Sequence, residues 1–113
     1  MPFRSFPKVD AVETVDRAAE EAIRTTGIEA RLILCTLRHF SRDQSLETAR
    51  LLERFSGSRV VALDLAADEA GHPIDAHVPA FRWALERGYA RTAHAGEATR
   101  ERLRTRLTGP PRR

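Results

Sequence analysis

The stretch ARLILCTLRHFSRDQSLETARLLERFSGSRVVAL, residues 30–63, has the pattern of one strand–helix–strand unit. It begins with an apolar run at 30–37 and ends with another at 59–63, and the segment between them has helical periodicity. Continuous apolar runs are typical of strands buried on both faces of a parallel sheet. The stretch therefore predicts two parallel strands joined by a helix.

The segment between the two runs carries signals for both ends of that helix. Ser41 and Gln44 have the spacing of a capping box, in which each side chain binds a backbone amide of the first turn. Gly57 lies where a helix commonly ends. The expected buried stripe is Leu46, Ala49, Leu52 and Phe55.

The same unit recurs on both sides of this stretch. A helix is expected over 10–26, with an apolar face of Val12, Val15, Ala19, Ala22 and Ile23. Another is expected over 75–87, with Val78, Phe81, Ala84 and Leu85 facing inward. The short segment 90–93 is too polar to be assigned as a strand from composition alone. Strand starts near 31, 59 and 90 would nevertheless give a repeat of about thirty residues, the length of one strand–helix unit. The predicted fold class is α/β, with about three consecutive parallel strand–helix units.

Length and charge define the organisation of the chain. A length of 113 residues fits one small domain. The net charge is +3, but residues 98–113 contain six arginines and one glutamate, or +5, so residues 1–97 sum to −2. We expect a folded part over 1–97 and an Arg-rich C-terminal tail over 98–113. No aromatic residue lies among the arginines of the tail, so nucleic-acid binding is not favoured, although a contact with phosphate is an alternative.

Cellular location is approached through the apolar runs and the single cysteine. The longest apolar run is far too short to span a bilayer, and the N-terminus has no apolar segment of a secretory signal. Cys35 cannot form an intramolecular disulfide, which favours a reducing compartment, and we expect a cytoplasmic protein without a membrane partner. Because Cys35 lies within an apolar strand, it is interpreted as a small buried hydrophobe.

Ionisable residues follow each of the three expected strands. These are Arg38-His39, Asp64 with Asp68-Glu69, and His94 with Glu97. Ligands of parallel α/β folds bind at the carboxyl ends of strands, so this placement favours a site there. The alternative is that these residues only cap helices and keep loops soluble. A histidine at a strand end can bind zinc, and a glutamate three residues later can transfer protons, but the pair alone is weak evidence.

Four segments together resemble the adenosine and adenine deaminase family. Residues 92–97, TAHAGE, are similar to its Thr-x-His-Ala-Gly-Glu signature, and residues 60–69, VVALDLAADE, to the strand and loop before it. Residues 27–39 resemble the preceding strand, and RSFP at 4–7 is similar to an earlier Arg-x-x-Pro. The matches occur in the family's order and spacing over about residues 10–97.

This resemblance implies a partial (β/α)8 barrel, from the end of strand 3 to strand 6, acting on a purine nucleoside or base. In the family a zinc-bound hydroxide attacks C6 of the purine, and ammonia leaves to give inosine. By motif position, the resemblance implies that His94 would be a zinc ligand and that Glu97 would protonate purine N1. Ala67 stands where the family has a glycine whose backbone N–H reaches the purine.

The chain also departs from the family pattern. It has no His-x-His, which supplies two zinc ligands in the family, and nothing similar to the metal-binding aspartate of strand 8. We therefore expect an incomplete zinc site and no activity of this chain alone. The alternative is a non-catalytic barrel remnant, or an interaction module that pairs with another chain or with itself through open strand edges.

Three further predictions concern polar residues near the motifs. His72 and His77 flank a proline-containing loop and are expected on the surface rather than at a metal. Asp64 is expected either to orient residues of the site or only to cap the end of its strand, and the sequence does not decide between these roles.

Overall fold

The computed structural model describes residues 8–97 and contains four helical segments and three strands. In chain order they are α1 (Lys8–Thr26), β1 (Leu32–Leu37), α2 (Arg42–Arg54), β2 (Val60–Ala66), the 3-10 helix η1 (Ile74–His77), α3 (Val78–Glu86) and β3 (Ala90–Arg91). The Arg-x-x-Pro match at 4–7 and the Arg-rich tail at 98–113 lie outside the described residues.

The three strands form one open sheet in the order β1-β2-β3, and both neighbouring pairs are parallel. This confirms the α/β class and the parallel units. Segment 90–93, which composition did not identify as a strand, does join the sheet. Beyond the two residues of β3, Thr92 donates its backbone N–H to Leu63 O at 2.9 Å and His94 donates to Leu65 O at 2.8 Å. Pairing with β2 thus overrides the polar composition of this segment.

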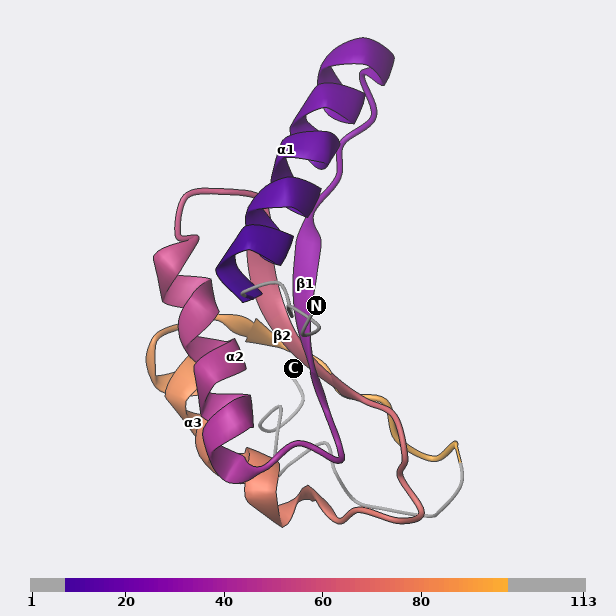
Figure 1. Ribbon diagram of the computed structural model, residues 1–113, viewed down its shortest axis with the longest axis vertical. Helices are drawn as coiled ribbons and strands as arrows, with labels where there is room; N and C mark the ends of the chain where they lie inside the picture. The colour runs from indigo at the N-terminus through magenta and orange to yellow at the C-terminus, as the bar shows by residue number, and fades with distance from the viewer. Residues whose placement is uncertain (1–7, 98–113) are drawn as a thin grey trace, which may run out of the picture.

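Helices α2 and α3 lie on one side of the sheet and enclose the core (Figure 1). The predicted capping box of α2 is present, with Ser41 and Gln44 each binding the other's backbone N–H. The fully buried apolar residues of these two helices are Ala49, Leu52, Ala80, Phe81 and Ala84. They pack against Leu63 and Leu65 of β2. Leu85 was expected to face inward but is exposed, because it lies outside the stripe formed by Phe81 and Ala84.

The opposite face of the sheet is exposed at β1 among the described residues. Ile33 is 53% exposed, and Cys35 is exposed as well. The expectation of strands buried on both faces is therefore wrong for β1. It holds for β2, where four successive residues, Ala62 to Leu65, are buried. Successive side chains of a strand point to opposite faces, and within residues 8–97 only one face of this sheet carries helices.

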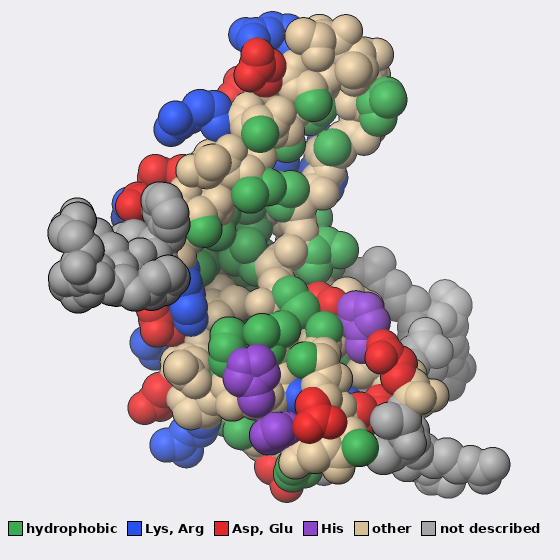
Figure 2. Space-filling model, turned by 45° about the vertical axis from the view of Figure 1, so that its right-hand side comes forward, with side chains coloured by type: hydrophobic (Ala, Val, Ile, Leu, Met, Phe, Trp, Pro, Cys, Tyr) green, Lys and Arg blue, Asp and Glu red, His purple; other side chains and the backbone are tan. Residues whose placement is uncertain are grey.

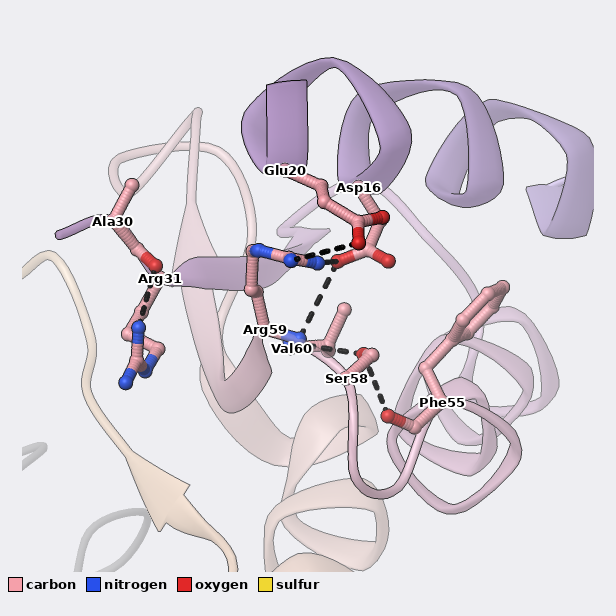
Figure 3. A network of polar contacts seen from close by, with 8 residues as sticks. All are labelled: Asp16, Glu20, Ala30, Arg31, Phe55, Ser58, Arg59 and Val60. Carbon is pink, nitrogen blue, oxygen red and sulfur yellow. Dashed lines mark hydrogen bonds and ion pairs between the residues drawn. The ribbon is translucent and has the colours of Figure 1, made fainter. Parts of the chain in front are cut away.

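Helix α1 rises beyond the sheet and has no buried residue (Figure 1). Its predicted apolar face is only partly covered, since Val15 is 52% exposed whereas Val12 packs against the core. Arg59, directly before β2, ties the helix to the sheet (Figure 3). Its guanidinium lies 3.3 Å from Asp16 Oδ1 and 3.7 Å from Glu20 Oε1, and its backbone N–H also donates to Asp16.

No helix within residues 8–97 is long and apolar enough to cross a membrane.

Candidate active site

The polar residues that follow the strands gather at one end of the molecule, as the sequence predicted. Figure 2 shows histidine and acidic side chains close together on the half of this face away from the free end of α1. An apolar patch separates them from that helix (Figure 2). The carboxyl ends of three parallel strands meet here, which is the usual location of a ligand site in such folds.

His94 and Asp64 form the central contact of this site. The ring Nδ1 of His94 lies 3.0 Å from Asp64 Oδ2 and 3.2 Å from the carbonyl oxygen of Leu65. Both neighbours only accept hydrogen bonds, so Nδ1 carries a proton. In the neutral ring the lone pair is then on Nε2, and the side chain is 55% exposed. This arrangement presents a nitrogen ligand to solvent while a carboxylate fixes the orientation of the ring.

Asp64 itself is an almost fully buried carboxylate. Its side chain is 10% exposed, and Oδ1 has no hydrogen-bond partner among residues 8–97. Sequence alone left two roles open for this residue, and its contact with the His94 ring corresponds to the orienting role. A buried carboxylate oxygen without a partner is unfavourable unless a further group completes its environment.

Cys35 lies beside Asp64 on the open face of the sheet. Its Sγ is 3.7 Å from Asp64 Oδ2, within the range of a sulfur hydrogen bond. The expectation of a buried cysteine is wrong, because the face of β1 that carries this thiol is the uncovered one. Partial desolvation and then the neighbouring carboxylate raise the pKa of the thiol to about 11. Cys35 is thus protonated at neutral pH and is not an activated nucleophile.

Ala67 is the one non-glycine residue among the described residues with positive φ, at 85°. It follows the end of β2 and is exposed at the rim of the site. This backbone conformation is easily adopted by glycine and is strained for alanine. The position therefore requires the geometry of a glycine, although the sequence supplies alanine.

The remaining predicted residues lie around this centre. Glu97 is exposed and follows Gly96, whose φ of 75° turns the chain after His94. Asp68 is exposed and accepts the N–H of Gly71, and its other oxygen lies 3.3 Å from His72 Nδ1. His39 is exposed, and its ring centroid is 6.5 Å from that of His72. These residues border the site without contacting the Asp64–His94 pair in any described interaction.

Two buried networks support the site, and the sequence did not reveal them. In the first, the Arg38 side chain is fully buried and lies 3.7 Å from the buried carboxylate of Glu69. It also donates to the backbone carbonyls of His72 and His94. The position of Arg38 after a strand suggested a polar cluster, but residue type and spacing do not show that a guanidinium is buried.

The second network runs through His77, which is buried rather than on the surface. The surface prediction is wrong because η1 places this ring beneath α2. Nε2 lies 3.0 Å from Arg38 O, Nδ1 lies 2.6 Å from Ser45 Oγ, and Thr36 Oγ1 lies 2.7 Å from the same hydroxyl. The carbonyl can only accept, so the proton is on Nε2 and Ser45 donates to Nδ1. Burial lowers the pKa of His77. Ser45 lies on the otherwise apolar face of α2, and a polar residue at that position is a signal that could have indicated such a network.

Metal-binding capacity can be assessed from the donor atoms. Nε2 of His94 suits zinc, and the partnerless Oδ1 of Asp64 would favour a nearby cation. Among residues 8–97, however, no three histidine, cysteine or acidic side chains are grouped as a metal site requires. The described residues therefore fit one side of a zinc site and do not complete it.

Comparison with known proteins gives a consistent result. The sequence profile described as adenosine deaminase matches residues 4–103. Adenosine deaminase of Mus musculus is 38% identical over 91 residues, covering 78% of this chain and 26% of that protein. Adenosine deaminase of Mycobacterium bovis is 39% identical over 92 residues, covering 80% of this chain and 25% of that protein.

Solved structures resemble the same part of the chain. A zinc-bound amidohydrolase from Burkholderia ambifaria aligns with a TM-score of 0.76 and 28% identity, over 81% of this chain and 25% of the other. Adenine deaminase from Arthrobacter aurescens aligns with a TM-score of 0.65 and 29% identity, over 75% and 26%. The chain thus spans about a quarter of the length of the relatives it matches.

Proposed function

Because the chain belongs to the adenosine deaminase family, we propose that it supplies part of the active site of a zinc-dependent purine deaminase. Its contribution is one zinc ligand, His94, a proton-transferring carboxyl group, Glu97, and part of the purine pocket, at Ala67. The substrate would be adenosine or adenine, converted to inosine or hypoxanthine with release of ammonia. This activity belongs to purine metabolism, and we propose a cytoplasmic location.

The geometry of His94 carries this proposal. Its Nδ1–H is held by Asp64 at 3.0 Å and its Nε2 lone pair is available on an exposed ring. A histidine ligand of a metal commonly has this form, in which a carboxylate fixes the tautomer and increases the basicity of the other nitrogen. A zinc ion bound there would lower the pKa of a water molecule and so provide a hydroxide at neutral pH.

Glu97 and Ala67 would act on the purine itself. Only Ala95 and Gly96 lie between His94 and Glu97, and the chain turns at Gly96, where φ is 75°. In the proposal this carboxyl group delivers a proton to purine N1 while C6 is attacked, which neutralises charge that would build up on the ring. The backbone N–H of Ala67, at the end of β2, would donate a hydrogen bond to the purine.

A chimera with a complete relative tests these assignments. Residues 10–97 replace the corresponding segment of Mus musculus adenosine deaminase, so that the rest of that protein completes the site. We expect the chimera to bind about one zinc ion per chain. We also expect loss of ultraviolet absorbance from adenosine as it is deaminated, whereas the 113-residue chain alone gives no turnover because a catalytic zinc needs about three protein ligands.

Two variants of the chimera separate the roles. His94→Ala should lose zinc and activity together. Glu97→Gln should keep zinc and lose about 10²- to 10⁴-fold in kcat, the usual contribution of a general acid or base. A folded chimera that deaminates adenosine equally well with either substitution would refute the site. Turnover by the 113-residue chain alone would show that its own residues complete a catalytic zinc site.

A second candidate function is favoured by the open face of the sheet. Ile33 and Cys35 are exposed there, and the outer edges of β1 and β3 carry no strand within the described residues. Unpaired strand edges and apolar faces promote association with another polypeptide. In this alternative the chain is a non-catalytic barrel remnant that pairs with a second chain or with itself. Light scattering at several concentrations tests it, and a monomer at all of them would count against it.

A further inference from the structure

Arg38 is the buried group that joins the three loops of the candidate site. Its side chain is fully buried, and that of Glu69 is 3% exposed. Nη1 donates to the carbonyl oxygen of His72 at 3.0 Å, and Nη2 lies 3.4 Å from the carbonyl oxygen of His94. Nη2 is also 3.7 Å from Glu69 Oε2. One guanidinium thus reaches the loop after β2 at two points and the end of the β3 segment at a third.

The contact with His94 fixes the backbone of this residue from its carbonyl side. Its N–H is already bound to Leu65 O at 2.8 Å, and its ring is bound to Asp64 at 3.0 Å. The carbonyl group of His94 lies between the Cα that carries the ring and the turn at Gly96. Without a donor at the carbonyl group, rotation of this peptide would move the ring away from Asp64 and change the direction of the chain toward Glu97.

We propose that Arg38 is a positioning residue, which sets the orientation of the His94 imidazole and of the turn that leads to Glu97. This inference rests on the proposed function, in which His94 is the metal ligand. Arg38 holds its position because a buried guanidinium needs a charged partner, which Glu69 provides, and because its own backbone is bound on both sides. Its N–H donates to Ala66 O at 2.9 Å, and its carbonyl oxygen accepts from His77 at 3.0 Å.

The planar fork of arginine is essential to this role. Glu69 and His72 place their acceptors at two points of the loop after β2, and His94 places one at the end of the β3 segment. The guanidinium nitrogens are spread widely enough to reach all three. A lysine keeps the charge but concentrates its donors at one atom. We therefore expect Arg38→Lys to retain the ion pair with Glu69 and to release the carbonyl group of His94.

The test reads the state of His94 in the full 113-residue chain without metal. Nitrogen-15 NMR of the histidine rings identifies the protonated ring nitrogen, and hydrogen exchange reports on the His94 N–H. In the unaltered chain Nδ1 should carry the proton and Nε2 should be unprotonated. In Arg38→Lys the two ring nitrogens should shift toward an equal mixture of tautomers, and protection of the His94 N–H should fall about tenfold, as expected for loss of one hydrogen bond to a charged group.

Arg59→Met is the matched control, because Arg59 also ties separate elements together but lies at the opposite end of β2. It should leave the His94 tautomer unchanged, although a small loss of global stability could lower protection of many amides together. If Arg38→Lys does not fold, Glu69→Gln decides the question, since the amide preserves shape and weakens the hold on the guanidinium. It should shift the His94 tautomer in the same direction by a smaller amount.

An unchanged His94 tautomer in a folded Arg38→Lys or Glu69→Gln chain would overturn the proposal, as would an equal shift in Arg59→Met. Because the measurement needs neither zinc nor substrate, it is independent of the proposed deaminase activity. A shifted tautomer together with an inactive chimera would retain Arg38 as a positioning residue and refute the proposed function.

Discussion

Replacing Ala67 with glycine should stabilise the protein, which is an unusual outcome for removal of a methyl group. Ala67 has a φ of 85°. For a residue with a Cβ atom, the left-handed region is about 1–2 kcal/mol less favourable than the right-handed region. Glycine avoids this strain but loses about 0.4–1 kcal/mol more backbone entropy on folding. The central values of these two ranges predict a gain of about 0.8 kcal/mol in the free energy of unfolding of Ala67→Gly.

Urea denaturation followed by circular dichroism measures this change, and thermal unfolding provides a second reading. For a domain of this size, a gain of about 0.8 kcal/mol raises Tm by roughly 3–6 °C. Ala70→Gly is the matched control. Ala70 lies in the same loop and is exposed, but its φ is not positive, so the substitution should lower the free energy of unfolding by about 0.4–1 kcal/mol.

Opposite signs for the two substitutions are the essential result. If Ala67→Gly is neutral or destabilising, the backbone at this position is not strained and the argument from φ is refuted. If both substitutions stabilise the protein equally, the effect comes from loop flexibility in general and not from the left-handed conformation.

Three further predictions concern the buried histidine, the thiol and the ion pair at α1. Since burial lowers the pKa of His77, the unfolded chain binds the proton more tightly than the folded chain does. The stability that the neutral ring contributes should therefore be complete above pH 6.5 and be lost as the pH falls from 6.5 toward the folded pKa. Urea titrations of the protein and of His77→Gln should differ in this window, and parallel profiles would contradict the assignment. Cys35, with a pKa of about 11, should be thiolate in only about one chain in 10³ at pH 8, so iodoacetamide should react slowly with it. Asp64→Asn should speed the reaction, because it removes the neighbouring negative charge. A reaction rate that inflects at an ordinary thiol pKa in the unaltered protein would disprove the shift. Arg59→Met should lower the free energy of unfolding by up to about 1 kcal/mol, a small amount because the ion pair with Asp16 is only partly buried. It should also increase proteolysis within α1. Unchanged cleavage would show that this ion pair does not hold the helix.

The order and type of the elements could be predicted from local sequence patterns. The capping box at Ser41 and Gln44 and the stripe containing Ala49 and Leu52 are decided within one helix, because helical periodicity and end signals act over a few residues. The motif at 92–97 likewise indicated the family, and its profile matches most of the chain. The end of the sheet at which polar residues gather followed from parallel connectivity.

What faces each strand was decided only by the tertiary structure. A run such as 32–37 has the same composition whether one face or two are covered, so the exposure of Ile33 and Cys35 could not be predicted from it. The same limit applies to segment 90–93, whose pairing depends on β2 and not on its own residues.

The sequence by itself determined the kinds of functional group at the site, and the tertiary structure determined their states. Only the packing of distant segments makes Arg38 a buried bridge, removes His77 from solvent and forces the Nδ1 tautomer on His94 beside Asp64. The physical reason is that burial and hydrogen-bond direction depend on partners many residues away. Residue type and spacing do not specify those partners.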